Sequence, residues 1–345
     1  MKTHSLLFLL PAALFLAAAP KLGAWDAPGH RIVNQLALDS LPADFPAFVR
    51  EPAAMERIAF LAGEPDRWSH AVDLPLRHSN WPDHYLDVEE LSEAGLDPAA
   101  IPSFRYDFTA DFAKAREAHA ANFPVIDPTK DTDHTRRWPG FLPWAVTESY
   151  GKLKAAFSAL KVYQELGTPG EIANAEADVI FQMGTMGHYV GDLSQPLHTT
   201  VHHDGWAGAN PHGYYTGKGF HTWIDSGLIA KAGIKTADLA PRVTPAEPLS
   251  LALRADGRDP VFVATMDFLM EQNKLVEPLY QMDLEHKLGR VDTPVSPEAR
   301  ALIEGQLNKG GEMLGGLWLT AWRAAQPESY LRSVLMKRKI AETPK

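Results

Sequence analysis

One segment restricts the fold more than any other: residues 168–198, which read TPGEIANAEADVIFQMGTMGHYVGDLSQPLH. Thr168 or Pro169 is suited to begin a helix, and Pro196 cannot continue one. The residues between them are largely apolar and recur at helical spacing. The segment therefore predicts a long, mostly apolar helix over 168–194.

Two polar residues interrupt the apolar half of this helix. His188 and Asp192 are four positions apart, so their side chains share one face. A charged side chain in such surroundings is costly unless it is paired or bound to a metal ion. A single His-x-x-x-Asp pair is more commonly an exposed polar pair, and that interpretation stays open at this point. The apolar neighbours of the pair are Ile180, Phe181, Met183, Met186, Val190 and Leu193.

The rest of the chain also has a helical pattern. Apolar residues recur at helical spacing, whereas runs that alternate strictly over strand lengths are scarce. The sequence therefore predicts an all-α, single-domain fold over 25–340, with a long loop over 199–220 between two helices. Further helices are expected at 31–41, 107–123, 142–166, about 221–231, 259–281, 296–324 and 327–338.

The N-terminus has the pattern of a secretion signal. Lys2 precedes an apolar run from Leu6 to Pro20 that is too short to span a bilayer, and Ala24 is small enough to precede a cleavage site. We expect residues 1–24 to be a signal peptide and the mature protein to be secreted or periplasmic. No later apolar run is long enough to cross a bilayer, so no transmembrane segment is expected in the mature chain.

Charge and cysteine content narrow the chemistry. The chain has no cysteine, so disulfides do not stabilise it even in an oxidising compartment, and metal ions are one alternative crosslink. The formal net charge of −10 argues against a protein held on nucleic acid by a basic surface. It does not argue against an enzyme whose positive charge comes from bound metal ions.

Further histidines and carboxylates suggest more than one metal ion. His221 and Asp225 repeat the four-residue spacing, and His198 follows the end of the long helix. Zinc takes imidazole nitrogen and carboxylate oxygen at about 2.0–2.2 Å. Two such pairs, one of them in an apolar helix, favour a metal site over exposed pairs. The upstream candidates are His30, Asp66 and His84.

Two other motifs carry less weight. The His-His-Asp run over 202–204 resembles the doublet of another class of metal phosphohydrolase, but Gly205 and Gly208 predict a loop where that doublet requires a helix. No Gly-x-Ser-x-Gly sequence occurs, so a serine hydrolase lacks its usual marker.

The set of metal-type residues resembles the trinuclear-zinc phosphodiesterases, which comprise the fungal and plant single-strand-specific nucleases and the bacterial zinc-dependent phospholipases C. HYVGDLSQPLH over 188–198 is the most specific shared motif, and FHTWID over 220–225 is the next. The resemblance runs from Trp25 to about Leu228. It implies the helical fold of that family with a long active-site loop, three zinc ions and hydrolysis of phosphodiester bonds. The positions that match its zinc ligands are Trp25, His30, Asp66, His84, His188, Asp192, His198, His221 and Asp225.

The resemblance also implies how these residues divide among three ions. The first ion would be held by Asp66, His84, His188 and Asp192, and the second by His198, His221 and Asp225. The third would be held by His30, Asp192 and the α-amino group and carbonyl oxygen of Trp25, so that Asp192 bridges two ions. Cleavage after Ala24 would then create a ligand, because the amino group of Trp25 is free only in a chain that begins there.

Two spacings are closer to the nucleases than to the phospholipases. Trp25 and His30 are five positions apart, and His198 and His221 are 23 positions apart. Asp225 also stands where the phospholipases tend to have Glu. The resemblance therefore favours an endonuclease that cleaves single-stranded DNA or RNA to 5′-phosphate products with a metal-activated water.

The same resemblance suggests residues around the metal ions. In HYLD, Tyr85 would stack on a base with Asp87 nearby, and Asn210 of the long loop would contact substrate. Arg67 would act near the phosphate, although the position of the family's arginine is Ser69 here. The candidate catalytic residues are thus Asp192, Asp87 and Arg67.

Two other functions stay open from the sequence. One is a zinc-dependent phospholipase C that acts on phospholipid headgroups, and the other is a non-catalytic exported protein that binds zinc. No obligate protein partner is implied.

Overall fold

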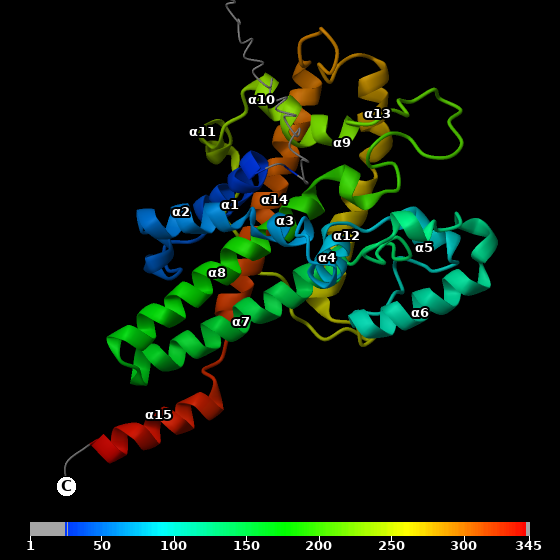
Figure 1. The fold of residues 1–345 in the computed structure, drawn as a ribbon. Coiled ribbons are helices and arrows are strands. Elements are labelled where there is room, and N and C mark those ends of the chain that lie inside the picture. Colours follow the sequence, from blue (N-terminus) through cyan, green and yellow to red (C-terminus); the bar gives the residue numbers. More distant parts are fainter. Residues whose placement is uncertain (1–24, 26, 343–345) are drawn as a thin grey trace, which may run out of the picture.

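The computed structural model describes residue 25 and residues 27–342, so the expected signal peptide over 1–24 lies outside the described residues (Figure 1). Its regular structure is helical, which confirms the predicted all-α class. The described residues form an isolated β-bridge, Leu86–Gly140, and no sheet. The helices are α1 (Ala27–Ser40), α2 (Pro52–Leu61), α3 (Glu64–Ser69), α4 (Leu74–Asn80), α5 (Val88–Glu93), α6 (Arg105–Ala118), α7 (Leu142–Leu166), α8 (Pro169–Ser194), α9 (Phe220–Thr222), α10 (Leu228–Ala232), α11 (Thr236–Leu239), α12 (Pro260–Asn273), α13 (Val276–Leu284), α14 (Pro297–Ala324) and α15 (Ser329–Glu342).

The long helices α7 and α8 form an antiparallel hairpin joined at Gly167 and Thr168 (Figure 1). Thr168 caps α8, because its Oγ1 accepts a hydrogen bond from the backbone N–H of Glu171 at 3.3 Å while a Glu171 carboxylate oxygen accepts from the N–H of Thr168 at 2.8 Å. Pro169 is the first helical residue. The predicted helices over 142–166 and 168–194 are confirmed.

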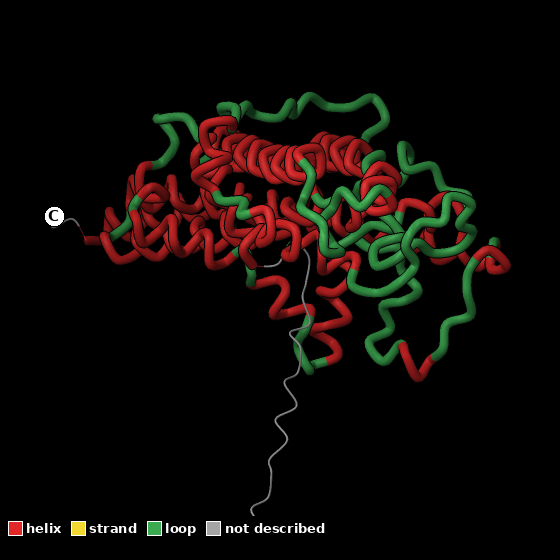
Figure 2. The backbone as a smooth tube through the Cα atoms, turned by 90° about the horizontal axis from the view of Figure 1, so that it is seen from above, coloured by secondary structure: helices red, strands yellow, loops and turns green. Residues whose placement is uncertain are grey.

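The second half of α8 is the centre of the fold. α8 packs against α1, α2, α7, α12 and α14, and every residue of it from Met183 to Ser194 is buried. Figure 2 shows the helical body with many of the loops gathered at one end. No described helix is both long and apolar enough to cross a membrane.

Glycines on α8 let α1 approach it closely. A Cβ on Gly187 would lie 1.7 Å from Asn34 Oδ1, and a Cβ on Gly191 would lie 2.5 Å from His30 Nδ1. The amide of Asn34 also donates to backbone carbonyls of α2 and α8 at 2.8 and 3.1 Å. This contact fixes His30, one turn before Asn34, against the polar face of α8.

Two predicted helices are interrupted. The single helix predicted over 259–281 is wrong: α12 and α13 are separate, because Pro278 has no N–H to bond the carbonyl of Lys274 and its ring clashes with that carbonyl. The helix predicted over 221–231 contains a π-helical turn at Trp223–Gly227 between α9 and α10.

Candidate metal centre

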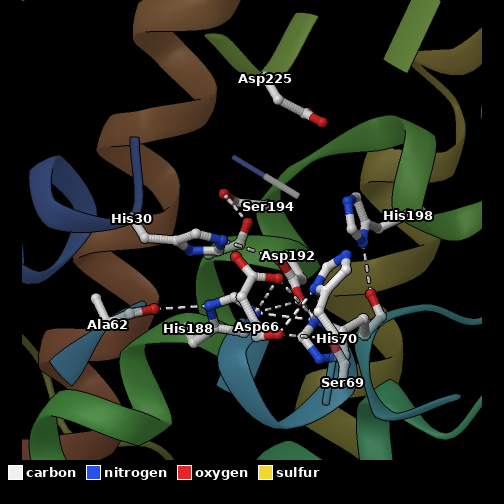
Figure 3. A network of polar contacts seen from close by, with 12 residues as sticks. His30, Ala62, Asp66, Ser69, His70, His188, Asp192, Ser194, His198 and Asp225 are labelled. Atoms are coloured by element: carbon white, nitrogen blue, oxygen red, sulfur yellow. Dashed lines mark hydrogen bonds and ion pairs between the residues drawn. The ribbon is translucent and has the colours of Figure 1, made fainter. Parts of the chain in front are cut away.

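Five side chains from four segments converge on the buried end of α8. Figure 3 shows four of them, His30, Asp66, His188 and Asp192. α8 supplies His188 and Asp192, α1 supplies His30, α3 supplies Asp66, and the short turn after α4 supplies His84. We call these five residues the inner group. His30, His188 and Asp192 are completely buried.

Asp192 lies at the centre of the inner group. Its Oδ1 is 3.3 Å from His30 Nε2, and its Oδ2 is 3.1 Å from His84 Nδ1 and 3.3 Å from His188 Nε2. Asp66 Oδ1 is 3.8 Å from His188 Nε2 and 3.9 Å from His84 Nδ1. Each oxygen of Asp192 thus faces a different set of imidazole rings, as a carboxylate that bridges two ions would.

Several buried atoms of the inner group form no hydrogen bond with the part of the chain that the structure describes. They are both carboxylate oxygens of Asp192, both ring nitrogens of His30, and Nε2 of His84. Within the described chain, the oxygens of Asp192 have only ion-pair contacts of 3.1–3.3 Å with the surrounding imidazoles, and burying charged groups without full hydrogen bonding is costly. Imidazole nitrogens and carboxylate oxygens are the donors that zinc takes, so these residues fit a metal ion better than they fit an ordinary polar core.

Backbone carbonyls set the orientation of two rings. His188 Nδ1 donates to the carbonyl of Ala62 at 2.7 Å, and His198 Nδ1 donates to the carbonyl of His84 at 2.5 Å. A neutral imidazole that donates through Nδ1 presents a lone pair at Nε2. Both Nε2 atoms face the clustered donors, and such supporting hydrogen bonds are typical of metal-binding histidines.

The charges of the inner group act strongly on one another. Burial lowers the pKa of His188, but the carboxylates of Asp192 and Asp66 outweigh it and raise that pKa to about 9. Burial, reinforced by the nearby His188, lowers the pKa of His30. Burial raises the pKa of Asp192, but His188 and the other surrounding histidines outweigh it and hold that pKa well below its usual value. A metal ion that binds here at neutral pH therefore displaces a proton from His188.

Three further residues, His198, His221 and Asp225, form a second cluster that we call the outer group. His221 Nε2 is 2.8 Å from His198 Nε2 and 3.1 Å from Asp225 Oδ2. The side chain of His221 is 22% exposed, whereas that of Asp225 is buried. Burial lowers the pKa of both histidines, and that of His221 falls well below its usual value. Both rings are therefore neutral at pH 7 and available to a metal ion.

Gln195 supports the outer group. Its Nε2 donates to Asp225 Oδ1 at 2.6 Å, and its Oε1 accepts from the backbone N–H of Leu197 at 2.6 Å. Gln195 is completely buried between the end of α8 and His198. It therefore fixes the carboxylate of Asp225 from the side opposite His221.

Trp25 is buried close to the inner group. Its indole Nε1 donates to Ser194 Oγ at 3.2 Å, and Ser194 follows Asp192 by two positions on α8. Figure 3 shows Ser194 beside Asp192 and His30. The use of the α-amino group of Trp25 as a ligand stays a prediction, because it requires a chain that begins at Trp25.

An open cleft of about 820 Å³ adjoins both groups, and Asp66, His84, His198 and His221 line it. The structure also brings Tyr85 and Asp87 to this cleft. Burial raises the pKa of Asp87 well above its usual value, and Glu90 and Glu89 add to the shift.

Two predicted site residues lie elsewhere. Arg67 is exposed, forms an ion pair with Glu64, and places its guanidinium 4.7 Å from the ring centre of Phe60. Asn210 closes a turn of the long loop, donating to the carbonyl of Tyr214 at 2.7 Å and accepting from its N–H at 2.8 Å. Neither Arg67 nor Asn210 is among the described residues that line the cleft. The roles expected for Arg67 and Asn210 near the substrate stay predictions.

The His-His-Asp run over 202–204 lies in a loop, as predicted. Asp204 Oδ1 accepts hydrogen bonds from the backbone N–H of Gly219 at 2.7 Å and of His221 at 3.3 Å. Its carboxylate thus holds the end of the long loop beside the outer group.

Several residues that line the cleft were not predicted from the sequence. Arg77, Arg136 and Trp138 line the cleft, yet they belong to segments without a recognisable motif. Gln195 stands inside the motif over 188–198, which is the signal that could have identified it.

No known family model matches this chain, and no curated protein matches its sequence. The case for a function therefore depends on the geometry of the inner group, the outer group and the cleft.

Proposed function

We propose that this protein is an exported zinc-dependent phosphodiesterase that cleaves single-stranded DNA or RNA to 5′-phosphate products. The observation that carries the proposal is that three clusters of His and Asp donors lie together, and that residues of two of these clusters, Asp66, His84, His198 and His221, line one open cleft. The inner group supplies two of these clusters and the outer group supplies the third.

Each cluster offers three donor atoms that lie within 4.8 Å of one another. The two inner clusters share His188, so its Nε2 would serve one inner ion, and Asp192 would be the ligand common to both inner ions. When bound, zinc ions supply an activated water near neutral pH and positive charge for the phosphate oxygens, so no protein nucleophile is needed. The assignment of zinc, and of three ions, is part of the proposal.

The chain's own residues hold the donors and receive the substrate. His30, His188 and Asp192 are carried by helices packed in the core, so their positions change little when substrate binds. Tyr85 lines the cleft beside them and offers an aromatic face to an unpaired base, which a base-paired strand cannot present. Asp87 keeps its proton at a higher pH than a free carboxyl group and can donate a hydrogen bond to substrate.

Export belongs to the same proposal. Removal of residues 1–24 as a signal peptide would place the protein in the periplasm or outside the cell and would free the amino group of Trp25. Support comes from the buried ring of Trp25, which lies against α8 through its hydrogen bond to Ser194.

A phospholipase C is the second candidate, and the edge of the cleft favours it. Pro124, Val125 and Ile126 line the cleft, and the side chain of Val125 is 98% exposed. An exposed apolar edge of this kind is common at surfaces that meet lipid or a partner.

A three-substrate assay tests the proposal. The purified protein is given single-stranded DNA, single-stranded RNA and phosphatidylcholine vesicles in turn, before and after chelation. We expect cleavage of both single strands with 5′-phosphate ends, loss of activity on chelation and recovery with zinc. Lipid cleavage without nucleotide release would replace the nuclease with a phospholipase C. Bound zinc without turnover of any of the three would support the non-catalytic zinc-binding protein.

A further inference from the structure

One wall of the cleft combines cations with aromatic rings. We call it the loop wall, because most of it belongs to the segments that precede and follow α5 and α6. Carboxylates line the same cleft, and two of them, Asp133 and Asp127, pair with Arg77 and Lys130 at 2.8 and 3.6 Å. The cations of the loop wall are Arg77, Lys130 and Arg136, and its rings are Trp81, Tyr85 and Trp138.

Arg136 is the arginine of the loop wall whose guanidinium is not already engaged. Arg77 Nε lies 2.8 Å from Asp133 Oδ2. By contrast, no residue in the described ranges forms a hydrogen bond or ion pair with the guanidinium of Arg136, although its backbone N–H donates to Asp131 Oδ1 at 3.1 Å. Its charge is therefore available to a ligand in the cleft.

The backbone holds the rings of the loop wall together. Leu86 and Gly140 form the isolated β-bridge, so the segments that carry Tyr85 and Trp138 lie side by side. Gly140 has a φ of 102°, and a Cβ there would lie 2.0 Å from the carbonyl oxygen of Tyr85. The close approach requires glycine, and it keeps both rings on the same cleft.

We propose that the loop wall binds a nucleotide next to the scissile phosphate, with Arg136 on its phosphate and Trp138 against its base. The proposal rests on the function proposed above and names its substrate class as a polynucleotide strand of several residues. Surfaces that bind single strands combine cations for the phosphates with aromatic rings for the bases. A phospholipid headgroup has one phosphate, which the metal groups would take, and it leaves Arg136 without a ligand.

An arginine outside the loop wall gives a matched test. Arg136→Gln removes a cation that lines the cleft. Arg57→Gln removes an exposed arginine of α2 that is not among the described residues of the cleft lining. For both variants of the zinc-loaded protein, kcat/KM is measured on a ten-nucleotide thymidylate strand and on the dinucleotide.

We expect Arg136→Gln to lower kcat/KM on the long strand by about tenfold, and by several-fold more than on the dinucleotide. The dependence of log kcat/KM on log salt should become shallower by about 0.7 for the lost phosphate contact. Arg57→Gln should stay within about twofold of wild type on both substrates. Equal losses on the two substrates, or equal losses in the two variants, would overturn the subsite.

A binding measurement separates this proposal from the proposed function. Fluorescence anisotropy of a labelled thymidylate strand with phosphorothioate linkages reports the subsite without turnover. Weaker binding by Arg136→Gln than by wild type supports the subsite even if wild type cleaves only lipid, in which case the proposed function alone fails. Equal binding by the two proteins, or no binding by wild type, would overturn the subsite whatever the enzyme cleaves.

Discussion

The inner and outer groups use the same kinds of side chain in different surroundings. In the inner group, His30 and Asp192 are completely buried and their donor atoms form no hydrogen bond with the described chain. In the outer group, Gln195 donates to Asp225, and His221 reaches the cleft with 22% of its side chain exposed. The inner donors therefore contact mainly one another, through ion pairs, whereas in the outer group a hydrogen bond from Gln195 already satisfies one oxygen of Asp225.

This difference separates two roles for bound metal. Ions of the inner group would stabilise the fold, because their loss leaves buried charges uncompensated. An ion of the outer group would exchange with solvent more readily, because the cleft reaches it directly. Four perturbations test the distinction.

Replacing the central carboxylate should have the largest effect. Asp192→Asn removes the charge between His30, His84 and His188, so we expect the inner ions to be lost and kcat/KM on single-stranded DNA to fall by on the order of 1,000-fold. Zinc per chain and kcat/KM are measured together. Asp225→Asn is the control, because it should empty the outer group and leave the inner ions bound. Wild-type activity in Asp192→Asn would show that the carboxylate does not hold the ions.

Crowding the contact between α1 and α8 should come next. The added Cβ of Gly191→Ala meets the ring of His30, so we expect the free energy of unfolding to fall by about 1–3 kcal/mol and the inner zinc content to fall with it. Gly170→Ala on the same helix is the control, because a Cβ there meets nothing within 4 Å. Denaturant unfolding and zinc content are the measurements. A Gly191→Ala protein as stable and as zinc-rich as Gly170→Ala would contradict the packing account.

Removing the support of Asp225 should affect the outer group alone. Gln195→Leu keeps the volume but deletes the hydrogen bond to Asp225, and we expect the affinity for the most weakly held zinc to fall by about 10- to 100-fold. Gln182→Leu, at a half-buried site on α8, is the matched control. Zinc titration against a competing chelator gives the affinities. A loss of the tightly held ions, or no change at all, would mean that Gln195 does not act on the outer group.

The two groups should also respond differently to pH. The pKa of His188 is raised to about 9, so a proton competes with the inner ion throughout the neutral range. Apparent zinc affinity of the inner group should therefore rise about tenfold for each pH unit between 7 and 9. The pKa values of His198 and His221 are lowered below 6.5, so the affinity of the outer group should stay constant over that range. Titrations at pH 7, 8 and 9 test this, and a pH-dependent outer group with a constant inner group would reverse the assignment.

The helical part of the site could be predicted because helix geometry fixes which side chains share a face. The four-residue spacing of His188 and Asp192 places both on one side of α8 whatever surrounds it. The position of His30 above them depends instead on close packing at Gly187 and Gly191, which periodicity alone does not reveal. His30 was included among the candidate ligands because of the resemblance to the zinc phosphodiesterases, not because of helix spacing.

The loop wall could not be predicted, because it too is formed by packing between segments that are distant in the sequence. Arg67 directly follows Asp66 in the sequence, but its guanidinium pairs with Glu64 and does not line the cleft. Arg136 lies far from these residues in the sequence, yet it lines the cleft. Whether a side chain lines the cleft depends on contacts between segments that are distant in the sequence, such as the Leu86–Gly140 bridge. The orientation of the Asn210 side chain likewise depends on its two hydrogen bonds to the backbone of Tyr214 within the loop.

We propose that the inner and outer groups hold metal ions with which the protein cleaves single-stranded nucleic acid. The most direct test measures metal content by mass spectrometry and cleavage of single-stranded DNA on one preparation, before chelation, after chelation and after zinc is returned. The account predicts about three zinc ions per chain, loss of cleavage as they are removed, and recovery of both together. A protein that holds no metal, or whose cleavage of the strand is unchanged when its metal is removed, would contradict it.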